Sequence, residues 1–200
     1  MAGSVVGVLI YINDTHTWGL PETFQEIVIP IHAIMGSIMV LIAPFQLAPA
    51  FRKAYPVVHR WMGRTYFFAQ YVSLTAAAVG APTLLFASQL YPTLFVLVVQ
   101  LWVLSIGTGV AALLAIRRGD WFNHRKWMIR NVCIVVSVPF GYVLVWASSA
   151  PFLGNSPVVW EPTYFPTFFF ATLISCMALS QVLLDLWWTT PYQPINVDFQ

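Results

Sequence analysis

Long stretches without a charged residue constrain this chain more than any other feature of its sequence. No Asp, Glu, Lys or Arg occurs in residues 27–51, 65–116, 131–160 or 162–184. A helix crosses the hydrocarbon core of a bilayer, about 30 Å thick, in about 20 residues. Each stretch is therefore long enough to span a membrane, and the second, with 52 residues, is long enough to span it twice.

The composition excludes the soluble classes of protein. Only 8% of the residues are charged and 59% are hydrophobic, whereas a soluble domain carries about 25% charged residues. Such a chain lacks the polar surface of a soluble enzyme and the basic surface of a nucleic-acid-binding protein. We therefore predict an all-α integral membrane protein that contacts the lipid bilayer and has no nucleic-acid partner.

Five transmembrane helices are predicted, because Pro82 and Pro92 bracket a turn within the longest charge-free stretch. The predicted spans are 27–49, 57–82, 92–116, 127–149 and 164–188. The first four form a four-helix bundle over residues 27–149, and the fifth is expected at its periphery. A non-cytoplasmic segment, 1–26, precedes the bundle. Residues 150–188 comprise an outer loop and the fifth helix, and 189–200 form a tail.

The basic residues predict the orientation. All nine Lys and Arg lie in or beside the two connections that follow the first and third spans: Arg52, Lys53, Arg60, Arg64, Arg117, Arg118, Arg125, Lys126 and Arg130. Five alternating spans place both connections on one face, which is cytoplasmic, or the matrix face in an organelle, by the positive-inside rule. The protein is thus predicted in a bacterial or organelle inner membrane, with its N-terminus outside and its C-terminus on the basic side.

The two basic connections repeat each other. The first reads RKAYPVVHRWMGR over Arg52–Arg64, and the second reads RRGDWFNHRKWMIR over Arg117–Arg130. The offset is 65 residues from the first arginine to its counterpart and again from His59 to His124, and a single residue is inserted in the second copy before the Trp-Met-x-Arg that ends both. We therefore expect two repeated hairpins related by a pseudo-twofold axis along the membrane normal. Both histidines then lie on the first turn of an outgoing helix.

These connections are the candidate functional site. Arginines at a helix N-terminus oppose the helix dipole, so their presence here needs an explanation. Membrane topology and anionic lipid headgroups are one explanation, and a bound dianion such as the propionates of haem is another. In the haem interpretation, His59 and His124 are the axial ligands of a haem b iron. The residues expected to meet the propionates or to wall the ring are Arg60, Arg64, Arg125 and Arg130, with Trp61, Met62, Trp127 and Met128. A metal site of His59, His124 and Asp120 is an alternative.

Other polar residues lie within the predicted spans. Gln46 lies on one stripe with small residues, and Tyr66 and Gln70 lie on another; both stripes are expected to pack inward against neighbouring helices. His32 is either a packing residue or a contact for a proton or quinone. Asp185 is expected at the inner interface of the fifth helix. Two further residues, Cys133 and Cys176, are expected to be buried and free of disulfides.

The order of these residues resembles a known family. The motifs His-Arg-x-x-Gly-Arg-x-Tyr, beginning at His59, and His-Arg-x-Trp-Met-x-Arg, beginning at His124, are similar to those of the membrane family called domain of unknown function 2306 over about residues 31–131. The family often carries an arginine further along the fourth helix, where this chain has Val138-Pro139-Phe140-Gly141, and Pro139 predicts a kink there. The resemblance implies no activity.

Two functions remain open at this point. The first is a non-catalytic accessory or structural subunit of a larger membrane complex, respiratory or photosynthetic, with other membrane subunits as partners and no cofactor. The second is a b-type haem electron carrier, with quinone as a candidate partner, and it would make the protein a haem-dependent membrane oxidoreductase if it is an enzyme at all. Lipid or small-solute transport is a further alternative. A reduced-minus-oxidised spectrum of the purified chain separates the first two.

Overall fold

The computed structural model describes residues 24–87, 92–148 and 164–188, and the regular structure in these segments is helical. A turn of π-helix, η2 (Phe24–Val28), leads into α2 (Ile29–Leu47). The short α3 (Pro49–Ala54) joins α2 to the long α4 (Pro56–Ala87). Three more long helices follow: α5 (Pro92–Arg117), α6 (Trp121–Ser148) and α7 (Tyr164–Trp188).

Prolines mark where three of these helices begin. Pro49, Pro56 and Pro92 are the first residues of α3, α4 and α5, a position that suits proline because its missing N–H has no partner within the helix there. A residue before proline is disfavoured in helical conformation. Ala48 (ψ 113°) and Tyr55 (φ −132°, ψ 64°) accordingly break the chain between α2, α3 and α4. The α2–α4 connection is therefore short and helical.

The connection from α5 to α6 is shorter still. Gly119 adopts a positive φ of 73°, which glycine accepts without steric cost. The side chain of Asp120 then accepts the backbone N–H of Asn123 at 3.0 Å and caps the N-terminus of α6. Because this cap lies at Asp120, α6 begins at Trp121, six residues before the predicted start at 127.

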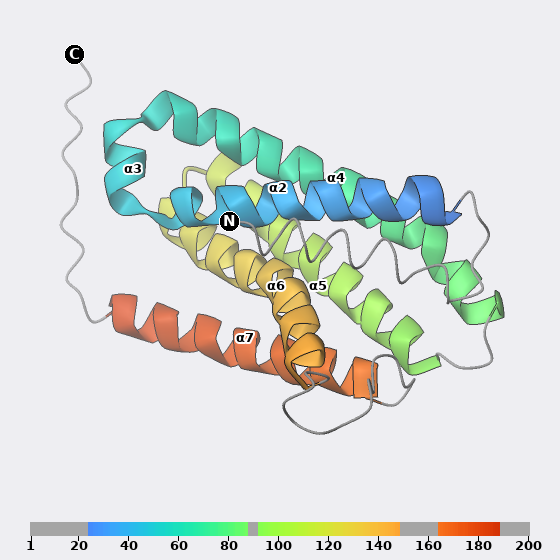
Figure 1. Ribbon diagram of the computed structural model, residues 1–200. Coiled ribbons are helices and arrows are strands. Elements are labelled where there is room, and N and C mark those ends of the chain that lie inside the picture. The colour runs from blue at the N-terminus through green and yellow to red at the C-terminus, as the bar shows by residue number, and fades with distance from the viewer. Residues whose placement is uncertain (1–23, 88–91, 149–163, 189–200) are drawn as a thin grey trace, which may run out of the picture.

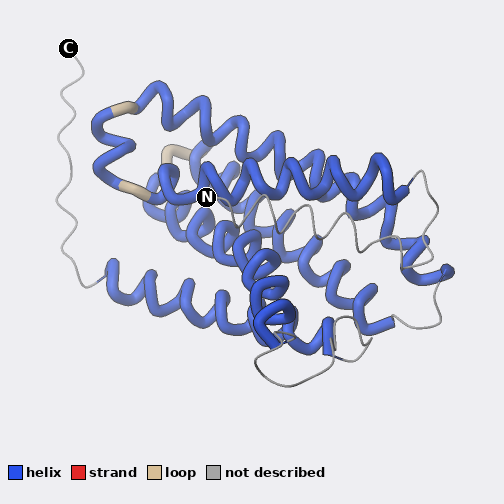
Figure 2. Tube along the Cα trace, in the orientation of Figure 1, coloured by secondary structure: helices blue, strands red, loops and turns tan. Residues whose placement is uncertain are grey.

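Four helices form a bundle on which the fifth packs (Figure 1). Helix α2 packs along α4 and α5 along α6, while contacts of α4 with α5 and of α2 with α6 close the bundle. Helix α7 lies along α6 and also touches α5. The α2–α4 and α5–α6 connections lie at the same end of the bundle (Figure 2), which we call the basic end because the nine Lys and Arg lie in or near these connections.

Three clusters of buried residues hold the helices together. The largest joins all four bundle helices through Met39, Ala43, Tyr66, Ala69, Ala112, Met128 and Val132. A second cluster fixes α7 against α5 and α6 and contains Leu97, Ile134, Phe169 and Leu173. The third, Ile129, Cys133 and Leu184, joins α6 to α7 nearer the basic end. Each cluster draws on helices that are far apart in the chain, so the helices support one another.

Large apolar side chains also cover the outside of the described helices. Phe68 and Tyr71 of α4 are 63% and 72% exposed, and Leu186 of α7 is 62% exposed. An exposed apolar surface of this extent is unfavourable in water and suits the hydrocarbon of a bilayer. Within the described residues, three helices are long and apolar enough to cross a membrane by length and composition: Glu26–Leu47, Phe95–Arg117 and Phe169–Leu186.

The five long helices occupy nearly the same residue ranges as the five predicted spans. The all-helical prediction is confirmed for the described part of the chain. Within the described side chains, no such stretch is found in α4 or α6, and each of these helices begins with a turn rich in arginine and histidine. Most of the predicted N-terminal segment 1–26, the outer loop and the tail 189–200 lie outside the described residues.

We predict that Gly141→Ala destabilises the contact between α6 and α7. A Cβ at Gly141 would lie 3.0 Å from ring atoms of Phe169, which is buried in the second cluster. Overpacking of this kind costs about 1–3 kcal/mol, which should lower the free energy of unfolding measured by denaturant titration in detergent. The control is Gly107→Ala, since no atom lies within 4 Å of a Cβ there. Equal stability of the two variants would contradict the prediction.

Candidate functional site

The two histidines of the basic end occupy the same position in their helices. His59 is the fourth residue of α4 and His124 is the fourth residue of α6. The backbone N–H of His59 donates to the carbonyl of Tyr55 at 2.9 Å, and that of His124 donates to the carbonyl of Asp120 at 3.0 Å. Each histidine therefore lies on the first hydrogen-bonded turn of an outgoing helix, as the sequence predicted.

The carboxylate at the start of α6 is already engaged. Besides capping the backbone of Asn123, Asp120 accepts the side-chain amide of the same residue at 2.6 Å. Donation from the backbone and side chain of Asn123 holds the pKa of Asp120 below its usual value, because these bonds stabilise the ionised form. The carboxylate of Asp120 therefore caps the N-terminus of α6.

The two histidine rings have different surroundings. Nδ1 of His124 lies 2.9 Å from the carbonyl oxygen of Ala112, and because a carbonyl only accepts, Nδ1 is the donor, so that in the neutral form of the ring the lone pair is on Nε2. Among the buried side-chain nitrogen and oxygen atoms of the described residues, only Nδ1 of His59 has no hydrogen-bond partner. Arg52, His124 and Arg60 lie close enough to His59 to interact with it electrostatically, so the two histidines lie near each other.

Two of the predicted arginines stack on tryptophans of their own helices. The guanidinium of Arg64 lies 4.9 Å from the ring centroid of Trp61, and that of Arg130 lies 5.0 Å from the ring of Trp127. A guanidinium over an indole face is a favourable cation–π contact. The motif repeated in the sequence thus corresponds to a repeated local geometry, three residues apart on each helix.

The remaining predicted site residues of this end lie nearer the surface. Arg130 also donates to Oε1 of Gln181 at 3.3 Å, and Gln181 donates to the carboxylate of Asp185 at 2.9 Å, so α6 and α7 are joined by polar contacts here. Asp185 is exposed, as expected for an interfacial residue. Arg60 is exposed and Arg125 is half-buried.

A network of buried polar side chains lies deeper in the bundle. The hydroxyl of Tyr66 donates to Oδ1 of Asn131 at 2.7 Å, and the amide of Gln70 donates to the same oxygen at 3.3 Å. The amide of Asn131 donates to the backbone carbonyl of Ser105 and to the hydroxyl of Thr108, each at 2.9 Å. All five residues are buried, so these bonds satisfy polar groups that lipid would leave without partners.

The sequence revealed only half of this network. Gln70 and Tyr66 were predicted on an inward stripe of α4, whereas Asn131, Ser105 and Thr108 were not identified. A signal was nonetheless present, because Asn131 lies 65 residues after Tyr66, the same offset that separates His59 from His124. Applying that offset to every polar residue of the stripe would have identified Asn131.

Two other predicted polar residues pack against the backbone of α4. Gln46 donates its amide to the carbonyl of His59 at 3.0 Å, close enough to Gly63 that a Cβ there would lie 3.4 Å from Oε1 of Gln46. His32 places Nδ1 3.0 Å from both the carbonyl and the hydroxyl oxygen of Ser73. Gln46 therefore belongs to the basic end, whereas His32 pairs with α4 farther along the bundle.

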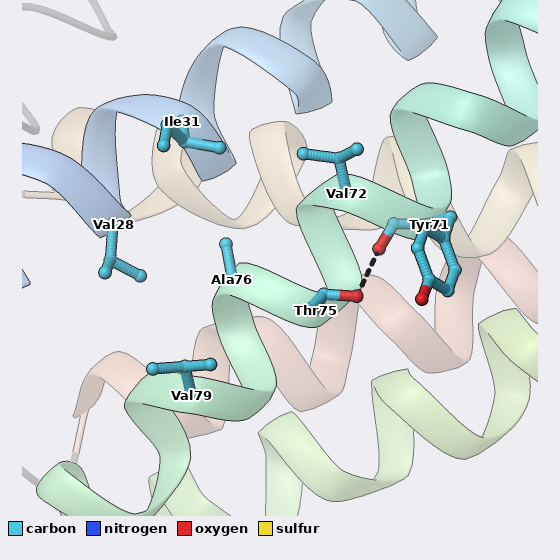
Figure 3. Close-up of a pocket in the computed structure, with 7 residues that line it drawn as sticks. All are labelled: Val28, Ile31, Tyr71, Val72, Thr75, Ala76 and Val79. Atoms are coloured by element: carbon cyan, nitrogen blue, oxygen red, sulfur yellow. Dashed lines mark hydrogen bonds between the residues drawn. The ribbon is translucent and has the colours of Figure 1, made fainter.

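An apolar groove between α2 and α4 lies away from these residues (Figure 3). It has a volume of about 270 Å³ and is lined by Val28, Ile31, Tyr71, Val72, Thr75, Ala76 and Val79. The hydroxyl of Thr75 donates to the backbone carbonyl of Tyr71 at 2.8 Å, within its own helix. The groove thus has the apolar character of a lipid-facing surface.

Neither cysteine forms a disulfide. Cys133 is buried, Cys176 is half-buried, and both are free, as predicted. Within the described ranges, there is no group of three or more His, Cys, Asp or Glu side chains that could hold a metal ion. His59, His124 and Asp120, the residues of the alternative metal site, are not brought together as such a group, and the carboxylate of Asp120 binds Asn123.

Comparison with known proteins identifies a family. Residues 29–175 match the model of the predicted membrane proteins designated DUF2306. The chain belongs to this family. The DUF2306 match covers the four bundle helices and continues into α7, beyond the part where the motifs resemble the family. No curated protein and no solved structure gives a significant match.

We predict that Tyr66 and Asn131 are energetically coupled. Removing one partner leaves a buried polar group unsatisfied, which costs about 1–3 kcal/mol. A double-mutant cycle of Tyr66→Phe and Asn131→Ala, followed by unfolding in detergent, should therefore give a coupling energy of about 0.5–2 kcal/mol. Thr75→Ala serves as a control, since its hydroxyl bonds only within an exposed turn. Strict additivity of the two substitutions would contradict the prediction.

Proposed function

We propose that this membrane protein crosses the bilayer five times, as two repeated hairpins, α2–α4 and α5–α6, with α7 outside them. Helices α2, α5 and α7 have the length and composition of spans, and α4 and α6 alternate with them along the chain. The buried polar residues of α4 and α6 bond to one another and to α5. A helix whose polar face is satisfied in this way within the bundle tolerates the surrounding lipid.

Contacts between residues at the same position of their helices support the repeat. Tyr66 and Asn131, each the eleventh residue of its helix, share a hydrogen bond, and residues related by a twofold axis touch only where that axis passes between them. The first turns of α4 and α6 also each bond to the preceding helix, the backbone of His59 to the amide of Gln46 and the ring of His124 to the carbonyl of Ala112. The pseudo-twofold axis would then pass through the polar network.

Single cysteines at Lys53 and Arg118, in a background of Cys133→Ala and Cys176→Ala, provide the test of this topology. Both sites are exposed, and five spans place them on the same side of the membrane. An impermeant maleimide applied to right-side-out and to inverted vesicles should label both from the basic face only. Labelling of the two sites from opposite faces would rule out the five-span arrangement.

For the function, we propose a b-type haem carried at the basic end, with His59 and His124 as axial ligands and electron transfer as its role. The observation that carries this proposal is a pair of histidines on equivalent first turns, of which His124 has its Nδ1 bonded to the carbonyl of Ala112 so that Nε2 is available to bind a metal. When bound, haem supplies the one-electron chemistry, and the protein supplies ligation, orientation and charge.

The donor set fits this group. The bond from Nδ1 of His124 to a backbone carbonyl is the arrangement that fixes the tautomer of metal-ligating histidines. The cations Arg52 and Arg60 act on the same place and suit the carboxylates of propionates. The chain's own residues would thus hold both the iron and the anionic edge of the cofactor.

The competing function is an accessory subunit of a larger membrane complex without a cofactor. Exposed aromatic side chains such as Phe68 and Tyr71 offer surface for lateral packing against other membrane subunits. Lipid contacts satisfy these side chains equally well, so the histidine pair favours haem over this alternative.

The test is an optical spectrum of the full chain, expressed with haem precursor and purified in detergent. A haem protein gives a reduced-minus-oxidised difference spectrum of the b type. The double variant that combines His59→Ala with His124→Ala should lose this spectrum. His32→Ala is the matched control, because His32 packs against Ser73, and it should retain the spectrum. A colourless wild-type protein that takes up no haem on titration would instead support the accessory function.

A further inference from the structure

The two histidines of the basic end are held to different degrees. His124 is fixed from outside its own helix by the carbonyl of Ala112 on α5. In the other hairpin, the corresponding contact with α2 uses the backbone of His59, which accepts the amide of Gln46. The ring of His59 therefore lacks the support that the ring of His124 has, and its Nδ1 is left unpartnered.

We infer that His124 is the anchoring ligand of this site and His59 the exchangeable one, so that the site opens one coordination position to a small external ligand. This inference rests on the proposed haem function and adds that the two axial histidines are unequal. The chemical class of external ligand is a small neutral donor, such as carbon monoxide or imidazole.

The physical basis is the outer-shell hydrogen bond. A ligating histidine whose second nitrogen donates to a carbonyl is held in one tautomer and orientation and is the stronger base, and losing such a partner typically costs 10–100-fold in metal affinity. Nδ1 of His59 has no such outer-shell bond to hold the ring.

The experiment compares His59→Ala with His124→Ala by haem titration of the full chain in detergent. His59→Ala should bind haem within a few-fold of wild type and give the five-coordinate, high-spin electron paramagnetic resonance signal, which added imidazole converts to low spin. His124→Ala should bind haem at least about 10-fold more weakly than His59→Ala. Equal loss in both variants, or the reverse order, would overturn the inference.

A second measurement needs no variant and covers the case in which a substitution prevents folding. Carbon monoxide added to the reduced wild-type protein should shift its spectrum, because an exchangeable His59 yields its position. A haem-loaded wild type that does not respond would contradict the inference while leaving haem binding intact. A wild type that takes up no haem would instead refute the proposed function, so the two failures are distinguishable.

Discussion

Polar groups in the middle of this bundle must find partners within the protein, because the hydrocarbon of a bilayer offers none. Asn131 meets this requirement for three helices at once. Its side chain accepts from Tyr66 and Gln70 of α4 and donates to Ser105 and Thr108 of α5. Because Asn131 belongs to α6, any sliding or rotation of one helix would leave several of these groups unsatisfied. The network therefore sets the register of the helices, which apolar packing alone leaves free to slip.

The hairpins differ where the fifth helix packs. In the first, α2 and α4 meet through a polar pair, His32 and Ser73. The residues 65 positions later are Leu97 and Val138, which belong to the apolar cluster around Phe169 of α7. Replacing the polar pair by apolar residues thus provides an apolar surface on which α7 packs. Helix α7 accordingly packs on the α5–α6 side of the bundle.

Much of the helical structure could be predicted from the sequence, since charge-free stretches and prolines report directly on helix extent. The predicted membrane span began only at 127 because hydropathy excluded the basic first turn of α6, although His124 was predicted on the first turn of this helix; the cap at Asp120 decides where the helix begins. The sequence could place His59 and His124 on equivalent turns. It could not show that only one of the rings bonds to a carbonyl, because that depends on how closely α2 and α5 approach these turns.

The charges around the histidine pair lead to a revised assignment of the arginines. Arg64 lies against Trp61, which is 61% exposed, so this pair belongs to the outer surface of α4. Arg130 is stacked on its own tryptophan and bonded to Gln181 of α7. The arginines that interact electrostatically with His59 are Arg52 and Arg60. An anionic group bound beside the histidines would therefore meet the α3–α4 connection first. The repeated Trp-Met-x-Arg turns instead fit a role in anchoring the basic end at the membrane interface, where tryptophan and arginine are both favoured.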